Sequence, residues 1–330
     1  MTHLLIAPAA AFCAALLLTA LMLWRRWHWA VDHPNDRSLH SDPTPRIGGL
    51  AIMAAVLSAT ALAALFTDRL PLPALALALV LAGVSLADDR SGLPIRARLG
   101  AHLLAGGVFA AYLTDNNAPW WWMAAAVLAM TAMTNFFNFM DGANGLAGGM
   151  AMIGFSFYSV AGMASAPGLA VFCSVVAAAA AGFLCFNLSG RIFMGDGGSV
   201  PIGFLAAAIG IEGWTRGIWP LWFGPLVFAP FVVDATVTLA RRAARGERFW
   251  LAHREHFYQR LVRSGWSHRR LAGAEYLLML ACGTAALAAR AGDAQVRTAA
   301  FATMAGLLLG AMVLIDRRWR RYLAAQGPRP

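Results

Sequence analysis

Charged side chains are scarce in this sequence, and lysine is absent. Only 13% of the 330 residues are charged, whereas 59% are hydrophobic. This balance excludes an ordinary soluble domain. All 26 basic residues are therefore arginines, and the formal net charge of +10 has to be explained from where they lie.

Several familiar motifs are also missing. The cysteines lie inside apolar runs without a CxxC pair, so we expect neither a disulfide framework nor a thiolate metal site. They are Cys13, Cys173, Cys185 and Cys282. There is no Walker P-loop, no GxGxxG fingerprint and no HExxH, because the histidines of "HREHFYQRL" (253–261) are three apart. The DGxxAR and GxxxDxxxD signature of CDP-alcohol phosphatidyltransferases is absent as well, since "DGANG" goes no further.

Long apolar runs are what the sequence has in abundance. Runs of about 20 residues recur along nearly the whole chain, each long enough to cross a hydrocarbon core of about 30 Å. We predict an all-α polytopic membrane protein, a single integral-membrane domain over 1–330 with about eleven spans. The expected spans are 4–24, 47–66, 71–87, 99–114, 120–140, 146–164, 168–186, 200–211, 219–240, 274–290 and 298–315.

The arginines predict the orientation. With the N-terminus outside, all but four of the 26 arginines fall in inside segments, a strong positive-inside signal. The four exceptions are Arg69, Arg216, Arg290 and Arg297. The first span has no charged residues before it and is followed by Arg25 and Arg26, so we interpret it as a retained helix rather than a signal peptide. We therefore expect a periplasmic N-terminus, a cytoplasmic C-terminus, contact with anionic membrane lipids and no nucleic-acid partner.

The polar residues collect on that inside face. We expect five cytoplasmic loops to form an active site, followed by a basic tail over 316–330. The loops are 25–46, 88–98, 141–145, 187–199 and 241–272. A transporter or flippase, the alternative function, needs polar groups at both faces and near the midplane. The asymmetry instead favours an enzyme that acts on a lipid.

Four carboxylates follow the ends of successive spans. Asp88 and Asp89 end the third span, Asp141 ends the fifth, and Asp196 lies after the seventh. Converging carboxylates repel unless a cation lies among them, and hard oxygen ligands favour Mg²⁺ or Mn²⁺. Taken singly, each aspartate could also be a helix cap or a solvated loop charge.

Three further stretches carry polar side chains. Asn135, Asn138 and Asp141 in "TNFFNFMDGANGLAGG" are three apart and predict one helical stripe, although Asn135 could equally bond a neighbouring helix. In "FMGDGGSV", glycines such as Gly195 allow backbone amides near an anionic oxygen, and Ser199 is placed to start the next helix; an ordinary glycine-rich turn is the alternative. "PTPRIGG" (43–49) reads as a turn that lines the substrate entrance.

The histidines of "HREHFYQRL" form the last set. His253, His256 and Arg260 have i, i+3, i+7 spacing and predict one helical face that holds phosphate oxygens. An amphipathic helix on lipid headgroups is the alternative. We interpret His40, His102 and His268 as structural or solvated.

In this order, "PTPRIGG", "DDR", "NFFNFMDGANGLAGG", "FNLSGRIFMGDGGS" and "HREHFYQRL" resemble the motifs of the polyprenyl-phosphate N-acetylhexosamine-1-phosphate transferases. The resemblance runs from residue 37 to 261, and the histidine motif is most similar to the O-antigen-initiating branch. It implies catalytic roles for Asp88, Asp89, Asn138, Asp141, His253, His256 and Arg260. It also implies magnesium binding by Asp196 and substrate binding by Asn187, Phe193, Asn144 and Gly195, with Phe193 stacked on uracil.

The sequence departs from that family at two positions. Asn144 stands where a second aspartate is common, and no lysine follows the aspartate pair, where only Arg96 and Arg98 are available. Arginine replaces the charge of lysine but not its geometry.

The resemblance implies a reaction and a location. Undecaprenyl phosphate attacks the sugar-linked phosphorus of a UDP-N-acetylhexosamine, directly or through a covalent aspartyl intermediate, and UMP leaves. The implied location is the bacterial inner membrane, with the site on the cytoplasmic face. The sugar, the glycan pathway and a homodimer are left open.

Overall fold

The computed structural model describes residues 3–26, 30–32, 43–114, 118–248, 251 and 253–326. This part of the chain forms thirteen helices and one antiparallel pair of two-residue strands, β1 (Val31–Asp32) and β2 (Thr44–Pro45). The helices are α1 (His3–Trp24), α2 (Gly48–Ala63), α3 (Leu72–Ser91), α4 (Ile95–Leu113), α5 (Trp120–Phe139), α6 (Leu146–Gly162), α7 (Pro167–Asn187), α8 (Asp196–Thr215), α9 (Phe223–Val227), α10 (Ala229–Ala244), α11 (Phe257–Arg263), α12 (His268–Ala291) and α13 (Ala294–Ala325).

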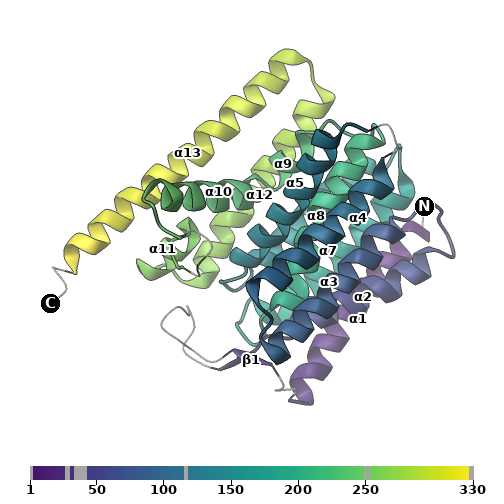
Figure 1. Cartoon of the computed structure of the whole chain (residues 1–330), viewed down its shortest axis with the longest axis horizontal. Coiled ribbons are helices and arrows are strands. Elements are labelled where there is room, and N and C mark those ends of the chain that lie inside the picture. The colour runs from purple at the N-terminus through teal and green to yellow at the C-terminus, as the bar shows by residue number, and fades with distance from the viewer. Residues whose placement is uncertain are drawn as a thin grey trace.

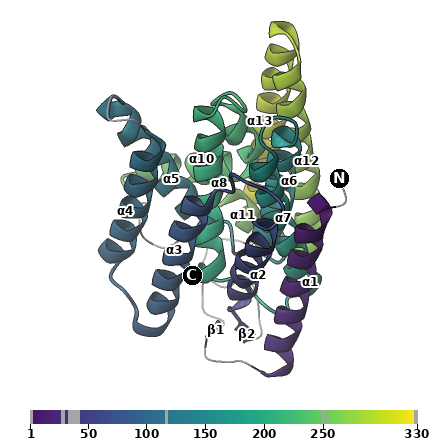
Figure 2. The same cartoon turned by 90° about the vertical axis from the view of Figure 1, so that its right-hand side faces the viewer.

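Two helices form the centre of the bundle (Figures 1 and 2). α7 packs against α1, α2 and α6, and α8 packs against α3, α5 and α2. α13 differs from them, because it extends along one side of the molecule and only 11% of the residues in its most apolar stretch are buried. The site described below lies at one end of the part of the bundle formed by α2–α8.

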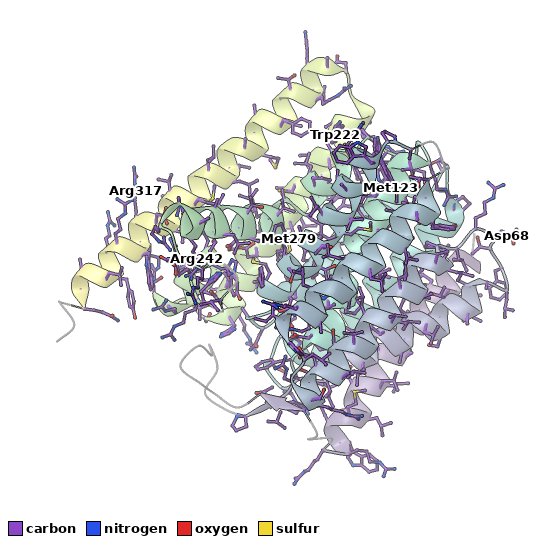
Figure 3. The ribbon with its side chains drawn as sticks, viewed as in Figure 1. Asp68, Met123, Trp222, Arg242, Met279 and Arg317 are labelled. Carbon is purple, nitrogen blue, oxygen red and sulfur yellow. The ribbon has the colours of Figure 1, made fainter. Side chains whose placement is uncertain are left out.

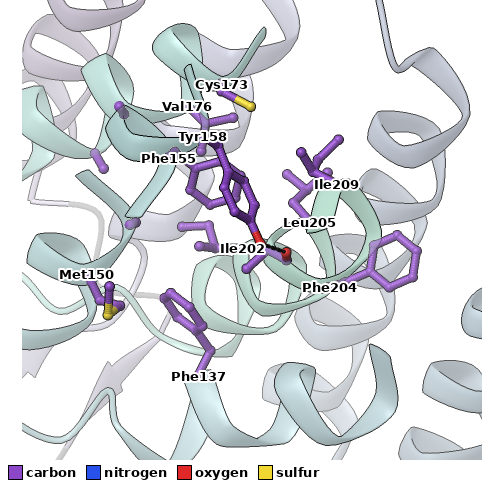
Figure 4. Close-up of a cluster of buried hydrophobic side chains, with 14 of the residues drawn as sticks. Phe137, Met150, Phe155, Tyr158, Cys173, Val176, Ile202, Phe204, Leu205 and Ile209 are labelled. Carbon is purple, nitrogen blue, oxygen red and sulfur yellow. Dashed lines mark hydrogen bonds between the residues drawn. The ribbon is translucent and has the colours of Figure 1, made fainter. Parts of the chain in front are cut away.

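Buried aromatic and aliphatic side chains pack together where α5, α6, α7 and α8 meet (Figure 4). Tyr158 is 1% exposed, stacks on Trp219 at a centroid distance of 4.9 Å, and donates a 3.0 Å hydrogen bond to the carbonyl of Ala206. Its hydroxyl thus has the partner that a buried polar group needs.

The helices support the predicted membrane class. Six of them are long and apolar enough to cross a membrane (α1, α3, α5, α7, α12 and α13), and α2 and α6 are shorter apolar helices. The protein is therefore an all-α, multi-pass membrane protein apart from its short strand pair. The expected total of about eleven spans and the sidedness of the termini stay predictions.

The expected continuous span over 219–240 is wrong. The chain there forms the short α9 and then α10, with a break at Phe228. Pro230 lies in the first turn of α10, where its missing N–H is tolerated, whereas a continuous helix would lose a hydrogen bond and clash with the preceding turn. As a result α10 turns away from the bundle and runs toward α11 and α13 (Figure 1).

The basic side chains are unevenly distributed between the α10–α13 side and the rest of the molecule. Arg242 of α10 and Arg317 of α13 lie on the same side of the molecule, and Asp68, Met123 and Trp222 lie toward the other end (Figure 3). The side formed by α10, α11 and α13 is therefore the arginine-rich one.

Backbone contacts join α2 to the α7–α8 turn. Gly48 N and Gly49 N donate to the carbonyls of Phe193 and Met194 at 2.9 and 2.8 Å, and Phe193 N donates to Pro45 O at 2.8 Å. A Cβ atom at Gly49 would overlap the backbone of Gly198. This close approach of α2 and α8 places the "PTPRIGG" segment directly against the "FMGDGG" turn.

We expect Gly49→Ala to destabilise the protein, because the added methyl group separates α2 from α8. Overpacking of this kind costs about 1–3 kcal/mol, which corresponds to a decrease in Tm of several degrees. Thermal unfolding followed by size-exclusion chromatography measures it. Gly83→Ala is the matched control, because a Cβ atom there meets open space. Equal Tm values for the two variants would contradict the close contact.

Candidate active site

The centre of the site is a guanidinium between two carboxylates. Arg46 Nη2 lies 2.9 Å from Asp196 Oδ1 and 3.4 Å from Asp89 Oδ1. Arg46 belongs to the segment that leads into α2, Asp89 lies in the last turn of α3, and Asp196 is the first residue of α8. Three segments distant in the chain therefore meet at one cation.

A second arginine extends this cluster. Arg98 Nη1 donates to Asp88 Oδ2 at 2.9 Å and lies 3.9 Å from Asp196 Oδ2. Asp88 Oδ1 also accepts the backbone N–H of Leu93 at 2.6 Å, which closes the turn between α3 and α4. Of the two arginines that could replace the missing lysine, Arg98 contacts Asp88 of the aspartate pair, whereas Arg96 is exposed.

The fourth carboxylate joins through the backbone. Asp141 Oδ2 accepts the N–H of Gly195 at 3.1 Å. Gly195 has a φ of +70°, and a Cβ atom there would overlap the carbonyl of Arg46, so the turn requires glycine. Because α5 ends at Phe139, Asp141 lies in the following turn and not on the expected helical stripe, which holds only for Asn135 and Asn138.

A cavity of about 370 Å³ opens beside the cluster. Its polar lining consists of Ser85, Asp88, Arg98, His102, Asn135, Asn138 and Asp196. Its remaining wall is apolar and comes from α3, α4, α5, α8 and α10. The cavity therefore offers a charged end and a hydrophobic wall to the same ligand. His102 was expected to be only structural or solvated, but it lines this cavity.

The charges in the cluster do not balance. Three carboxylates, Asp88, Asp89 and Asp196, contact two guanidiniums. The fourth, Asp141, joins the cluster through the backbone N–H of Gly195. Across the described ranges, no three His, Cys, Asp or Glu side chains are arranged to enclose a metal ion. The donor set therefore does not form a closed protein cage, but it fits Mg²⁺, which commonly binds one or two carboxylates and takes other oxygens from substrate phosphates.

The predicted substrate-binding residues differ in how they are held. The Asn187 side chain accepts from Gly145 N at 2.7 Å and donates to Ile192 O at 2.8 Å, so its amide joins two turns of the protein. Asn144 N donates to His268 Nδ1 at 3.1 Å, which gives His268 the structural role that we expected. Phe193 is half-buried beside Pro45 and Gly48. Nucleotide contacts of these residues stay predictions.

The expected helical face of His253, His256 and Arg260 is wrong. α11 begins at Phe257, so both histidines precede it, and only Arg260 is helical. The two imidazole rings stack instead, with centroids 4.9 Å apart. Arg260 is directed to α13, where its Nη1 donates to Asp316 Oδ1 at 2.8 Å. Their catalytic roles stay predictions.

Two smaller expectations concern Ser199 and His40. Ser199 does not start α8, because the helix begins at Asp196 and the Ser199 hydroxyl donates within it to Gly195 O. Gly195 is the N-cap residue instead. His40 lies outside the described residues.

Asp234 of α10 is the residue that the sequence analysis overlooked most clearly. Its carboxylate lies 2.9 Å from His256 Nδ1 and accepts the backbone N–H groups of Phe257 and Tyr258, each at 3.1 Å. The signal was present, since a lone aspartate inside a predicted span is a functional candidate by default. Arg46 was also overlooked, although its motif had been singled out.

Burial, together with the positive charge of the neighbouring His256 and Arg242, lowers the pKa of His253 to about 4. His253 is therefore a neutral imidazole near pH 7. It can hydrogen-bond an anion but does not add charge to its binding.

The comparisons with known proteins agree with the motifs. The sequence profile of glycosyl transferase family 4 matches residues 71–213. A decaprenyl-phosphate N-acetylglucosaminephosphotransferase of Mycobacterium leprae is 31% identical over 299 residues, which covers 75% of this chain and 74% of that protein. An undecaprenyl-phosphate alpha-N-acetylglucosaminyl 1-phosphate transferase of Yersinia pestis is 28% identical, covering 88% of this chain and 85% of that protein. A probable undecaprenyl-phosphate N-acetylglucosaminyl 1-phosphate transferase of Bacillus subtilis is 27% identical, covering 76% and 74%.

We expect Arg46→Gln to destabilise the protein by about 1 kcal/mol, or ~2–4 °C in Tm, because Asp89 and Asp196 lose the cation between them. Added Mg²⁺ should restore more stability to this variant than to the wild type. Thermal unfolding with and without Mg²⁺ measures both effects. Arg96→Gln is the control, since Arg96 is exposed beside the cluster. The same Tm for both variants would show that Arg46 does not balance these charges.

His253 predicts a pH effect on stability. Because the folded protein lowers the pKa of His253 from 6.5 to about 4, the unfolded chain binds a proton in this range that the folded chain does not. The free energy of unfolding should therefore decrease as the pH falls from 6.5 to 4. In His253→Gln the decrease should be shallower, because the titrating group is gone. Thermal unfolding across this pH range tests it, and parallel curves for the two proteins would refute it.

Proposed function

The chain belongs to the polyprenyl-phosphate N-acetylglucosamine-1-phosphate transferases of glycosyl transferase family 4, and from this premise we propose its reaction. The protein transfers a 2-acetamido-sugar 1-phosphate from a UDP-sugar to undecaprenyl phosphate. An oxygen of the acceptor phosphate attacks the sugar-linked phosphorus, the bond from that phosphorus to the bridging oxygen breaks, and UMP leaves with that oxygen. The product is a polyprenyl-diphospho-sugar that starts a surface glycan such as O-antigen.

One observation carries this proposal. Aspartates at the end of α3, in the turn after α5 and at the start of α8 gather with Arg46 and Arg98 at the charged end of a cavity whose other wall is apolar. A lipid phosphate requires this combination, because its headgroup is anionic and its chain is hydrophobic. A nucleotide without a lipid partner would not need the apolar wall.

The arginines can offset the main physical difficulty of the reaction, which is charge repulsion. Both substrates are anions and repel one another, and further negative charge develops in the transition state. Arg98 lines the cavity, and Arg46 contacts Asp196 of its lining. Each guanidinium can exchange an aspartate contact for a phosphate contact. Asn138 at the cavity wall can donate to the same oxygens.

We propose Asp196 as the ligand of Mg²⁺, with Mn²⁺ as a substitute. Asp196 lines the cavity, and the cluster has two more carboxylates than guanidiniums. When bound, the ion supplies positive charge for the diphosphate oxygens. Asp89 and Asp141 lie within the same cluster and hold Arg46 and the Gly195 turn in place.

We propose direct attack by the acceptor rather than a covalent aspartyl intermediate. Asp88 lines the cavity, but its two oxygens accept from Leu93 N and from Arg98. Hydrogen bonds to a carboxylate stabilise its charge and reduce its nucleophilicity. A phosphomonoester near neutral pH already carries about −1.5 to −2 charges, so Asp88 orients Arg98 and the acceptor and does not need to be a strong base.

The orientation follows from the donor. We propose that this end of the bundle faces the cytoplasm of the bacterial inner membrane, because UDP-sugars are made there and most arginines belong to this side. The relatives are named for N-acetylglucosamine, so it is the first sugar to test.

The test is UMP release by purified protein from a panel of UDP-2-acetamido sugars with undecaprenyl phosphate. We expect release only when the acceptor and Mg²⁺ are both present, and we expect Asp196→Asn to lower the rate at least about 1,000-fold. Asp68→Asn is the control, because Asp68 precedes the start of α3 whereas Asp88 and Asp89 lie at the other end of that helix. No UMP from any sugar would favour a transporter of lipid-linked sugars, release without acceptor would favour the covalent path, and full activity of Asp196→Asn at saturating Mg²⁺ would remove it as the ligand.

A further inference from the structure

A buried polar stripe on α10 holds the histidine segment. Asp234, Thr238 and Arg242 are spaced four apart, and all three are buried. Arg242 pairs with Glu255, and Asp234 pairs with the next residue, His256. The stripe runs along the helix face that packs on the segment before α11. α10 thus holds Glu255 and His256, which follow His253 closely in the chain.

Both side-chain oxygens of Asp234 accept hydrogen bonds. Oδ1 lies 2.9 Å from His256 Nδ1, and it accepts from Phe257 N at 3.1 Å and from the Thr238 hydroxyl at 3.1 Å. Oδ2 accepts from Tyr258 N at 3.1 Å. The side chain is 8% exposed, so these bonds replace water. Two of the partners are backbone N–H groups, which can only donate, so the carboxylate form is the one that this site satisfies.

The imidazole of His256 is held on all sides but one. Its side chain is 3% exposed, its ring lies against His253 and Phe139, and Nδ1 faces Asp234. Nε2 makes no hydrogen bond with a described residue, yet it is not among the fully enclosed polar atoms. It is therefore the nitrogen left open to a ligand.

The first turn of α11 also contacts the turn that follows α5. The hydroxyl of Tyr258 donates to Phe139 O at 2.9 Å and lies against Gly142, next to Asp141. Phe139 also lines the cavity. The start of α11, which follows His256, therefore contacts the turn that carries Asp141, beside the carboxylate cluster.

We propose that Asp234 is the positioning residue of the site. It binds the Nδ1–H of His256, which selects this tautomer, prevents rotation of the ring and presents Nε2 to the substrate diphosphate. A carboxylate that orients a histidine in this way is a general device of catalytic and metal sites. The inference rests on the proposed function, because it assigns His256 to the diphosphate of that reaction. A purely structural role, as a cap for the N-terminus of α11, is the alternative.

The first measurement is independent of activity. We expect the ¹⁵N NMR signals of His256 in the wild-type protein to show Nδ1 protonated, identified by their loss in His256→Gln. In Asp234→Asn the signals should change, because an amide NH₂ group can face Nδ1. Asp316→Asn is the matched control, since Asp316 anchors α11 through Arg260 without contacting His256, and it should leave the signals unchanged. An Nε2-protonated ring in the wild type would overturn the proposal, whether or not the variants fold.

The second measurement is a double-mutant cycle on UMP release. We expect Asp234→Asn to lower kcat by about 100-fold or more with a small change in KM. In the His256→Ala background the same substitution should add less than about a twofold loss. An equal loss in both backgrounds would mean that Asp234 acts only on the fold. If the wild type releases no UMP, the proposed function fails, and the NMR result still decides whether Asp234 sets the tautomer.

Discussion

The bridging of aspartates by two arginines is the interaction on which the site depends. Carboxylates this close repel in a partly buried environment unless cations lie between them. Arg46 separates Asp89 from Asp196, and Arg98 separates Asp88 from Asp196. These contacts also join the segment before α2 to α3, α4 and α8. The charged side chains that we propose to bind the substrates therefore also hold the ends of four segments together.

A second constraint comes from the break before α10. Pro230 ends the continuation of α9, and α10 then leaves the bundle with Asp234 in its second turn. That direction brings Asp234 to the start of α11, where its oxygens replace the partners that the first N–H groups of a helix lack. The carboxylate cluster and the histidine segment meet at the turn after Phe139, through Tyr258 on one side and Asp141 on the other. The direction of α10 thus joins two groups of polar residues that would otherwise be separate.

Some of this arrangement could be predicted and some could not. Asp88, Asp89 and Asp196 were found because the end of an apolar run marks a membrane boundary, and polar residues at several such ends share one level. The helix expected over His253 and His256 was wrong because an i, i+3, i+7 pattern over three residues also occurs in an irregular segment. Arg46 was overlooked because prolines and glycines made its segment look like a simple turn, and Asp234 because the apolar run around it suggested an uninterrupted span.

The sequence by itself determined the class of the protein. Scarce charge, long apolar runs, arginine placement and five motifs in order are all local along the chain, so they establish an α-helical membrane protein of this family without knowledge of packing. Only the tertiary structure decided which side chains pair. Arg46 and Asp196 are 150 residues apart, and they meet because glycines let α2 and α8 touch through their backbones. Pairing of this kind depends on how helices pack in three dimensions, which no local pattern in the chain records.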